Sequence, residues 1–394
     1  MASVAGPEGR RGILEYMAAK RPAIANELRS IADRRGRVLQ GRMAGGADLM
    51  GRIVEMSLKG KMIRGCLVFL GRDVAVPKDV AVPRDATVPT DAARPDGEVV
   101  GLAAAMELFQ TGLLVHDDIM DRDTLRRGGP TIHASYASEL RDAGIEESGR
   151  FGEALGICAG DACYFEAFAA LARALAQALA GKPRASEILA VCAEFLSEVV
   201  VAQMADVRWG ASETEASEAD ILAMYRFKTA RYSFSLPLAV GALSAGSDAL
   251  APPLIELGEL LGTLFQLRDD ELGLFGDMAS TGKGVGSDLR EGKKTLFRAR
   301  LLAAAPSREL PRLAALFGGT VEAGPEDIAY IRRLSEELGV MRSIVELSRK
   351  SEVEARAIIR ALARPIASER GGGLAPETAG LLEDMVEYVT RREK

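Results

Sequence analysis

The sequence predicts an all-α protein, a single large helical bundle around a central cavity. Segments rich in alanine and leucine continue through the 394 residues, with apolar positions at helical spacing. Few runs show the strict alternation or the β-branched residues that favour strands. The chain is longer than the about 250–300 residues of a usual single core, but no change of pattern divides it. We therefore expect one helical domain over residues 1–394.

The first predicted helix covers Ile13–Leu39. Lys61 and Arg64 follow it and are spaced so that one helical turn could present both to an anion. Residues 73–96 then interrupt the helical pattern with an imperfect hexad repeat, VAVPKD-VAVPRD-ATVPTD, and a proline in each unit. Proline at this interval excludes a helix, and the charges favour an exposed, extended and dispensable insertion.

The segment Val99–Asp121 is predicted to be the central helix, because it is apolar nearly all round and such a helix is buried. It ends in Asp117, Asp118 and Asp121, of which the first and the last share one helix face. Like charges so placed repel each other, whereas a hard cation such as Mg²⁺ would stabilise them. A solvated acidic helix end remains the alternative for this motif alone.

Two arginines, Arg126 and Arg127, follow the first acidic motif and precede a glycine-proline turn. Carboxylates that can hold a metal, followed by guanidinium groups that can hold phosphate oxygens, indicate a diphosphate site. A second apolar helix ends in the same way, at Asp269 and Asp270, and lysines follow it at Lys283 and Lys293. Two such helix ends in one chain argue against coincidence.

Composition narrows the classes of partner. A net charge of −6 without a long basic block argues against nucleic acid. The four cysteines lie in apolar helical contexts and the two histidines offer no zinc set, so we expect reduced thiols and a cytoplasmic protein. We expect no signal peptide and no transmembrane segment, because no uninterrupted apolar run reaches about 18 residues.

These motifs together resemble the trans-isoprenyl diphosphate synthases, and HDDIMDRDTLRRGGPTIH is most similar to the geranylgeranyl diphosphate synthase branch. The resemblance covers about residues 13–390. It implies head-to-tail condensation of isopentenyl diphosphate with an allylic diphosphate, in a homodimer. It also implies three Mg²⁺ ions per active site, with Mn²⁺ able to substitute, and the ligands Asp117, Asp118, Asp121, Asp269 and Asp270.

The resemblance also assigns substrate contacts. Lys61, Arg64 and Arg127 would hold isopentenyl diphosphate, with Gln110 where the family usually has histidine. The allylic diphosphate would be met by Arg126, Lys228, Thr229 and Lys283, and Gln266 and Lys293 complete the substrate-binding set. The residues expected to act in catalysis are Asp117, Asp121, Arg126, Lys228 and Asp269. Two further departures are Gly65 after the arginine, where the family usually has proline, and Gly273 where a third aspartate often stands.

In the family, the residue five before the first aspartate often limits product length. Here it is Gly112, which has no side chain to stop the growing prenyl chain. The next candidates for the floor of the chain's tunnel, where growth would stop, are Leu108 and Phe109, one helical turn (about 5.4 Å) deeper. We expect a twenty-carbon product, with farnesyl or longer products as alternatives. Gly112 could instead serve only to let two helices approach closely.

Three rival functions stay open at this point. A terpene cyclase would share the first acidic motif, but FQLRDDELGLFGD does not supply the usual second metal pattern of that class. A non-catalytic prenyltransferase subunit would tolerate loss of the motifs, which all survive here. A purely structural helical protein would not need both acidic sites.

Overall fold

The computed structural model describes residues 12–76, 97–178, 184–212, 214–276, 289, 292–318, 323–364 and 374–392. These residues are overwhelmingly helical, which confirms the predicted all-α class. The strands they contain are a two-residue pair, β1 (Leu125–Arg126) and β2 (Gly129–Pro130). The greater part of the predicted insertion, as well as Lys283, lies outside the described residues.

Two compact units can be distinguished by their internal contacts. The first consists of Met1–Val191 and Pro237–Ala251, and the second of Cys192–Leu236 and Pro252–Lys394. The expectation of a single domain over the whole chain stays a prediction.

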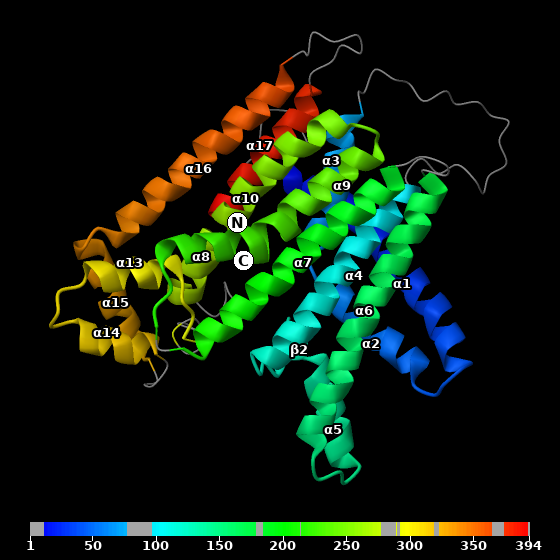
Figure 1. The fold of residues 1–394 in the computed structure, drawn as a ribbon, viewed down its shortest axis with the longest axis horizontal. Helices are drawn as coiled ribbons and strands as arrows, with labels where there is room; N and C mark the ends of the chain where they lie inside the picture. The colour runs from blue at the N-terminus through cyan, green and yellow to red at the C-terminus, as the bar shows by residue number, and fades with distance from the viewer. Residues whose placement is uncertain are drawn as a thin grey trace. The chain divides into compact units, whose positions relative to one another are not determined.

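The first unit is organised around α4, the helix predicted to be central. Its helices are α1 (Ile13–Gln40), α2 (Gly46–Leu58), α3 (Ile63–Ala75), α4 (Gly97–Met120), α5 (Ile132–Asp142), α6 (Ser148–Ala178), the start of α7, most of α9 (Leu236–Ser244) and the 3₁₀ turn η2 (Asp248–Leu250). α4 contacts α1, α2, α3, α5 and α6, and runs beside α6 in Figure 1. Because it is covered on several sides, its apolar residues can lie all around it.

Two glycines allow α3 and α9 to cross closely. A Cβ atom at Gly71 would lie 2.1 Å from the carbonyl oxygen of Leu238, and one at Gly241 would lie 2.1 Å from that of Val68. The obstacle in both cases is backbone, which cannot rotate away as a side chain can. The crossing therefore requires glycine at both positions.

The second unit holds the chain's other acidic helix end. Its elements are most of α7 (Arg184–Gly210), α8 (Glu218–Met224), the π-helix η1 (Tyr225–Ser235), α10 (Ala251–Phe275), α13 (Leu296–Ala304), α14 (Leu310–Phe317), α15 (Pro325–Glu337), α16 (Val340–Ala363) and α17 (Pro376–Arg391). In Figure 1, α16 and α17 lie beside each other as an orange and a red helix.

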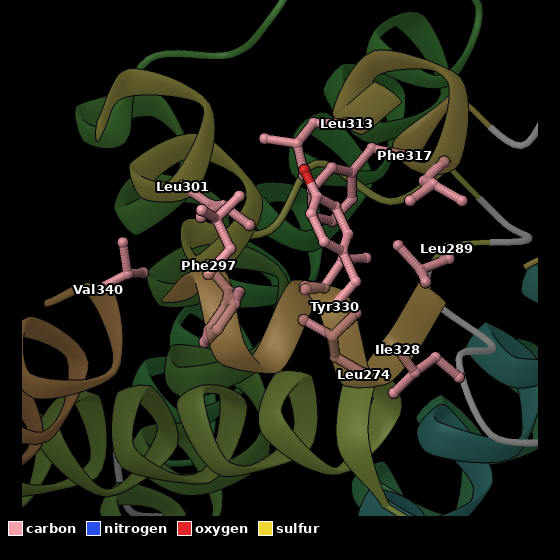
Figure 2. Packing of buried hydrophobic residues seen from close by; sticks show 12 residues of the cluster. Leu274, Leu289, Phe297, Leu301, Leu313, Phe317, Ile328, Tyr330 and Val340 are labelled. Atoms are coloured by element: carbon pink, nitrogen blue, oxygen red, sulfur yellow. The ribbon is translucent and has the colours of Figure 1, made fainter. Parts of the chain in front are cut away.

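A hydrophobic cluster joins α13, α14 and α15 in this unit. Figure 2 shows Phe297 and Leu301 of α13 gathered with Leu313 of α14 and Tyr330 of α15. The hydroxyl of Tyr330 has a hydrogen-bond partner, because it donates to Glu309 at 2.7 Å. The cluster thereby packs α13 against α14 and α15.

Three helices are long and apolar enough to cross a membrane by length and composition: α4, α6 and α7. Their apolar windows are interrupted by polar residues, so the expectation of no transmembrane segment stays a prediction. In α4, 67% of the apolar window is buried inside the protein, against 44% in α6 and 28% in α7. A helix that is apolar on all sides suits a protein core as well as a bilayer.

We predict that Gly71→Val lowers the free energy of unfolding by at least about 1–3 kcal/mol, the usual cost of an overfilled core. Thermal or denaturant unfolding followed by circular dichroism measures the effect. The matched control is Gly51→Ala in α2, where a Cβ meets nothing within 4 Å. That change should stabilise the helix by about 0.5–1 kcal/mol, and equal losses in both variants would contradict the crossing argument.

Candidate functional site

The first acidic motif lies at the carboxyl end of α4. Asp117 is partly buried, Asp118 is only 1% exposed, and Asp121 is exposed one residue beyond the helix end. The amide of Asp121 donates to the carbonyl of Asp117 at 2.8 Å, so the helical spacing continues to the third carboxylate. The predicted shared face of Asp117 and Asp121 is therefore compatible with the backbone.

The helix ends in a Schellman motif that holds an arginine where glycine is usual. The amide of Asp123 donates to the Asp118 carbonyl at 2.8 Å, and that of Arg122 to Ile119 at 3.2 Å. Arg122 occupies the left-handed region with φ 58°, a conformation in which most non-glycine residues are strained. This strained end fixes the direction in which the chain leaves the carboxylates.

A short hairpin then brings the two predicted arginines back. β1 and β2 pair antiparallel, with Arg126 opposite Gly129. The two turn residues, Arg127 and Gly128, have φ values of 52° and 75°. Two residues with positive φ in a two-residue hairpin loop are the pattern of a type I′ turn. Strain of this kind on a non-glycine residue is typical of functional sites.

Arg126 and Asp118 form a buried ion pair. The Nε of Arg126 donates to Oδ1 of Asp118, and its Nη2 donates to Asp123 at 3.2 Å. Oδ2 of Asp118 is buried without a hydrogen-bond partner. Burial raises the pKa of Asp118 to about 6, although the charge of Arg126 opposes that shift. The carboxylate therefore lies in a place where one guanidinium does not fully stabilise its negative charge.

Arg127 lies against the loop that contains Lys61. Its Nη1 donates to the carbonyl of Met56 at 3.1 Å, and a Cβ on Gly60 would lie 2.8 Å from that nitrogen. Only a residue without a side chain leaves room for this guanidinium. The glycine of the GKMIR motif therefore serves the arginine of a different segment.

Lys61 and Arg64 are arranged differently from the sequence expectation. α3 begins at Ile63, so Arg64 is in its first turn whereas exposed Lys61 precedes the helix. Between them, Met62 adopts φ 55°, a third left-handed non-glycine residue. The two cations do not share one helical turn. Gln110 lies on α4 between Asp117 and the buried Glu107, with Gln110 about two turns and Glu107 about three turns before Asp117.

In the second unit, Lys228 and Thr229 lie in the π-helix η1. The amide of Leu236 donates to the carbonyl of Arg231, five residues earlier, which is the π-helical pattern. The helix continues directly into α9, which contains Pro237 in its first turn. Lys228 donates to Asp206 of α7. A wider turn of this kind often marks a functional segment.

Asp270 belongs to a buried hydrogen-bond chain. It is 7% exposed, accepts from Tyr225 at Oδ2, and accepts from Gln266 at Oδ1 over 2.8 Å. Gln266 in turn accepts from Thr229 at 2.9 Å, and the Tyr225 hydroxyl accepts from the amide of Leu296 at 2.9 Å. Both carboxylate oxygens are thus engaged within the protein, and the network joins η1, α10 and α13.

Asp269 has a different environment. Its side chain is 56% exposed, and Oδ1 accepts from Nη2 of Arg392 at 2.5 Å. The Arg392 guanidinium also lies over the ring of Phe265, 3.6 Å from its centroid, and the Arg392 carbonyl accepts from Arg268 at 2.9 Å. Of the two aspartates, Asp269 is therefore the one that can reach a ligand in solvent.

The lysines after α10 divide between two roles. Lys293 is exposed. Lys294 donates to the carbonyls of Ser212 at 2.7 Å and Thr214 at 2.6 Å, which ties the start of α13 to the segment after α7. The sequence placed Lys293 in the site, and its exposure is compatible with that prediction.

The donor set suits Mg²⁺ shared with a phosphate. Among the described residues, no group of three or more His, Cys, Asp or Glu side chains could hold a metal ion by itself. Mg²⁺ commonly keeps several waters and binds through one or two carboxylates together with substrate phosphates. In the first unit, Asp117 and Asp121 are carboxylates of that kind, and buried Asp118 between them in the sequence has an Oδ2 without a hydrogen-bond partner. In the second unit, exposed Asp269 is another.

Gly112 is a point of close packing between α4 and α6. A Cβ there would lie 2.8 Å from Tyr164 and 3.0 Å from Cys163. The ring of Tyr164 therefore fills the space that the missing side chain leaves. Phe109, one turn deeper, is fully buried and packs edge-on against Phe168 with ring centroids 4.9 Å apart. These contacts support the alternative that Gly112 lets two helices approach.

A comparison with known protein families matches residues 48–334 to the polyprenyl synthetases. The chain belongs to the polyprenyl synthetase family. This confirms the resemblance drawn from the motifs.

Similar proteins carry more specific names. The geranylgeranyl diphosphate synthase of Saccharolobus solfataricus is 36% identical over 229 residues, 57% of this chain and 62% of that protein. A short chain isoprenyl diphosphate synthase of Methanothermobacter thermautotrophicus is 32% identical over 222 residues, 56% of this chain and 62% of that one. The matches therefore span 62% of the length of both relatives.

A solved structure is similar over nearly the whole chain. It is the geranylgeranyl pyrophosphate synthase from Corynebacterium glutamicum, complexed with isoprenyl diphosphate and magnesium. The two agree with a TM-score of 0.78 and 28% identity, covering 95% of this chain and 99% of that one. The polyprenyl synthetase fold is thus confirmed beyond the residues that the sequence match covers.

Sequence reasoning did not single out three residues that the structure places near the predicted site residues of their own unit. Tyr225 and Arg392 contact the second acidic motif from distant segments, and Glu107 lies buried on the central helix. Nothing in the local sequence of Tyr225 or Arg392 marks them. Glu107 did leave a signal, because a carboxylate inside a helix that is apolar all round needs a partner.

We predict that Tyr225→Phe lowers the free energy of unfolding by about 1–3 kcal/mol, since Asp270 and the Leu296 amide each lose a buried partner. Urea unfolding compared with the wild type measures it. Tyr330→Phe is the matched control, because its hydroxyl bonds only the partly exposed Glu309. A cost no larger than that of the control would mean that the buried chain does not hold Asp270.

Proposed function

We propose that this polyprenyl synthetase condenses isopentenyl diphosphate head to tail with an allylic diphosphate, forming a longer prenyl diphosphate. The observation that carries the proposal is the end of α4. There, buried Asp118 keeps one oxygen without a hydrogen-bond partner, and the hairpin that follows strained Arg122 returns Arg126 to the acidic motif. Anionic substrates that arrive with a divalent cation satisfy both the carboxylates and the arginines. The names of the similar proteins agree with this chemistry.

The residues divide by substrate. Arg126, Lys228 and Thr229, with Lys283, bind the allylic diphosphate, and Lys61, Arg64, Gln110 and Arg127 hold isopentenyl diphosphate. Gln266 acts through Thr229, to which it is hydrogen-bonded. Exposed Lys293, which precedes α13, contacts diphosphate oxygens as well. Fixed cations of this kind stabilise charge as it develops on a leaving group.

Asp117, Asp121 and Asp269 would hold Mg²⁺, supported by Asp118 and Asp270. The bound ions supply stabilisation of the negative charge on the departing diphosphate. We propose three ions per site, with Mn²⁺ able to substitute. Magnesium in the similar Corynebacterium glutamicum structure supports the choice of metal.

The reaction itself breaks the allylic carbon–oxygen bond. The double bond of isopentenyl diphosphate attacks the allylic cation, a new carbon–carbon bond forms, and a proton leaves the neighbouring carbon. The released diphosphate is the proposed proton acceptor, so no side chain is assigned as base. The apolar residues around α4 exclude water, which would otherwise trap the cation.

We propose a twenty-carbon product, with farnesyl and longer products as alternatives. Gly112, Leu108 and Phe109 were the candidates for the floor of the growing chain. Because Tyr164 fills the space beside Gly112, we add this residue to that floor. The relatives' names include both short-chain and geranylgeranyl synthases, and identities of 32% and 36% do not choose between them.

The assembly and location remain proposals as well. We propose a homodimer, supported by large apolar side chains exposed on α6, among which Phe165 is 72% exposed. On α7, Val201 is likewise 67% exposed. Burial of such side chains against a second copy would be favourable. We also propose a cytoplasmic location, which rests on the unpaired cysteines: Cys66, Cys163 and Cys192 are buried thiols.

We predict that activity requires Mg²⁺ or Mn²⁺, and that Asp117→Ala and Asp269→Ala each lower turnover at least about a hundredfold. Loss of one contact to the developing charge costs about 2.7–4 kcal/mol. Purified protein is incubated with isopentenyl diphosphate and each allylic primer, and the dephosphorylated products are separated by chromatography. Asp142→Ala, an exposed aspartate at the end of α5, is the control. Full activity in excess chelator, or a cyclic hydrocarbon product, would contradict the proposal.

The same assay tests product length. We predict that Phe109→Ala and Tyr164→Ala each lengthen the main product by five carbons, since one helical turn of about 5.4 Å matches about one isoprene unit. Gly112→Phe should mainly destabilise the contact between α4 and α6, because its Cβ has no room. Phe151→Ala on the exposed face of α6 is the control. Unchanged products in the first two variants would exclude this pair of helices from length control.

A further inference from the structure

A buried carboxylate lies on the central helix outside the acidic motif. Glu107 of α4 is 4% exposed, and its Oε1 accepts from the amide of Gly65 at 2.8 Å. The backbone amide of Arg64 also donates to it. Glu107 thus accepts from the first turn of α3, where orphan amide groups need acceptors.

Two cations face this carboxylate. Burial raises the pKa of Glu107, while the positive charges of Arg64 and Arg127 lower it. The same interaction acts on Arg127: burial lowers the pKa of its guanidinium, the charge of Glu107 opposes that shift, and the repulsion of Arg64 adds to it. Glu107 is therefore the shared counter-ion of two arginines that would otherwise repel each other.

Gly65 makes this arrangement possible. It donates its amide hydrogen to Glu107, which a proline at this position could not do. It also leaves room, since a Cβ there would lie 2.8 Å from Ile24 and 3.4 Å from Cγ of Glu107. The glycine thus gives this chain a direct link between the first turn of α3 and the middle of α4.

We infer that Glu107 is a positioning residue, which holds Arg64 and Arg127 together so that both can bind the diphosphate of the non-allylic substrate. The inference rests on the proposed function. Without the negative charge, the two guanidinium groups lose their counter-ion and move apart, whereas a glutamine oxygen could still accept from the Gly65 amide. The acidic end of α4, more than two turns away, keeps its own ion pair with Arg126. Loss of Glu107 should therefore affect one substrate more than the other.

The test compares Glu107→Gln and Glu107→Asp with the wild type in steady-state kinetics. Glu107→Gln keeps the size of the side chain but removes its charge. We expect KM for isopentenyl diphosphate to rise at least about tenfold, as for loss of a charged hydrogen bond. KM for the allylic primer and kcat should stay within about twofold. Glu107→Asp keeps the charge and should restore part of the affinity.

Thr111→Val is the matched control on the next turn of α4. Its hydroxyl donates to the main-chain carbonyl of Glu107 at 2.8 Å and lies 2.8 Å from the Ser57 hydroxyl. Ser57 retains its bond to the carbonyl of Ile53 at 2.8 Å when Thr111 is replaced. This variant loses a buried polar contact without touching either arginine, so both KM values should stay unchanged. Titration calorimetry with isopentenyl diphosphate, without a primer, gives a second readout that does not depend on turnover.

An unchanged KM for isopentenyl diphosphate, or an equal rise for both substrates, would overturn the inference. If Glu107→Gln does not fold, the KM values of Glu107→Asp for the two substrates are compared with those of the wild type instead. The melting temperature of Glu107→Asp checks that this variant folds. A wild-type protein that forms no prenyl product would instead refute the proposed function. Calorimetry on the same variants then separates the two failures, because it reports binding alone.

Discussion

The site depends on carboxylates that α4 carries inside the protein. Burial of an apolar helix costs little free energy. Glu107 and Asp118 on this helix, however, cannot remain charged without cations nearby. Those cations come from other segments, Arg64 from α3 and Arg126 and Arg127 from the hairpin. The loops around α4 are thereby held in strained conformations that they would not adopt alone.

The second acidic motif is organised on a different principle. Both carboxylate oxygens of Asp270 accept hydrogen bonds, from Tyr225 and from Gln266, and these bonds hold the end of α10. Its neighbour Asp269 is exposed to solvent and forms an ion pair with Arg392. Adjacent aspartates on a helix point in different directions, which lets one serve the structure and the other the chemistry.

Much of this arrangement could be predicted from the sequence. Helical periodicity gave the fold class, and the position of Asp117, Asp118 and Asp121 at a helix end followed from the apolar run before them. The family resemblance was confirmed by the match over residues 48–334. The individual roles of the site residues stay predictions, although the structure gives their surroundings.

What could not be predicted depends on contacts between distant segments. The ion pair of Arg392 with Asp269 joins residues 123 positions apart, and no local pattern marks such a pair. The left-handed turns at Arg122 and Arg127 were hidden because arginine has no preference for positive φ. The filled space beside Gly112 was hidden too, since it depends on Tyr164 of α6.

The crossing of α3 and α9 has a consequence for how the sequence can drift during evolution. In most of a core, a larger side chain can be accommodated when a neighbour becomes smaller, so positions vary in pairs. At Gly71 and Gly241 the neighbour is a carbonyl oxygen, which every amino acid possesses. No second substitution can create the missing room. These two positions should therefore remain fixed while the side chains around them continue to exchange.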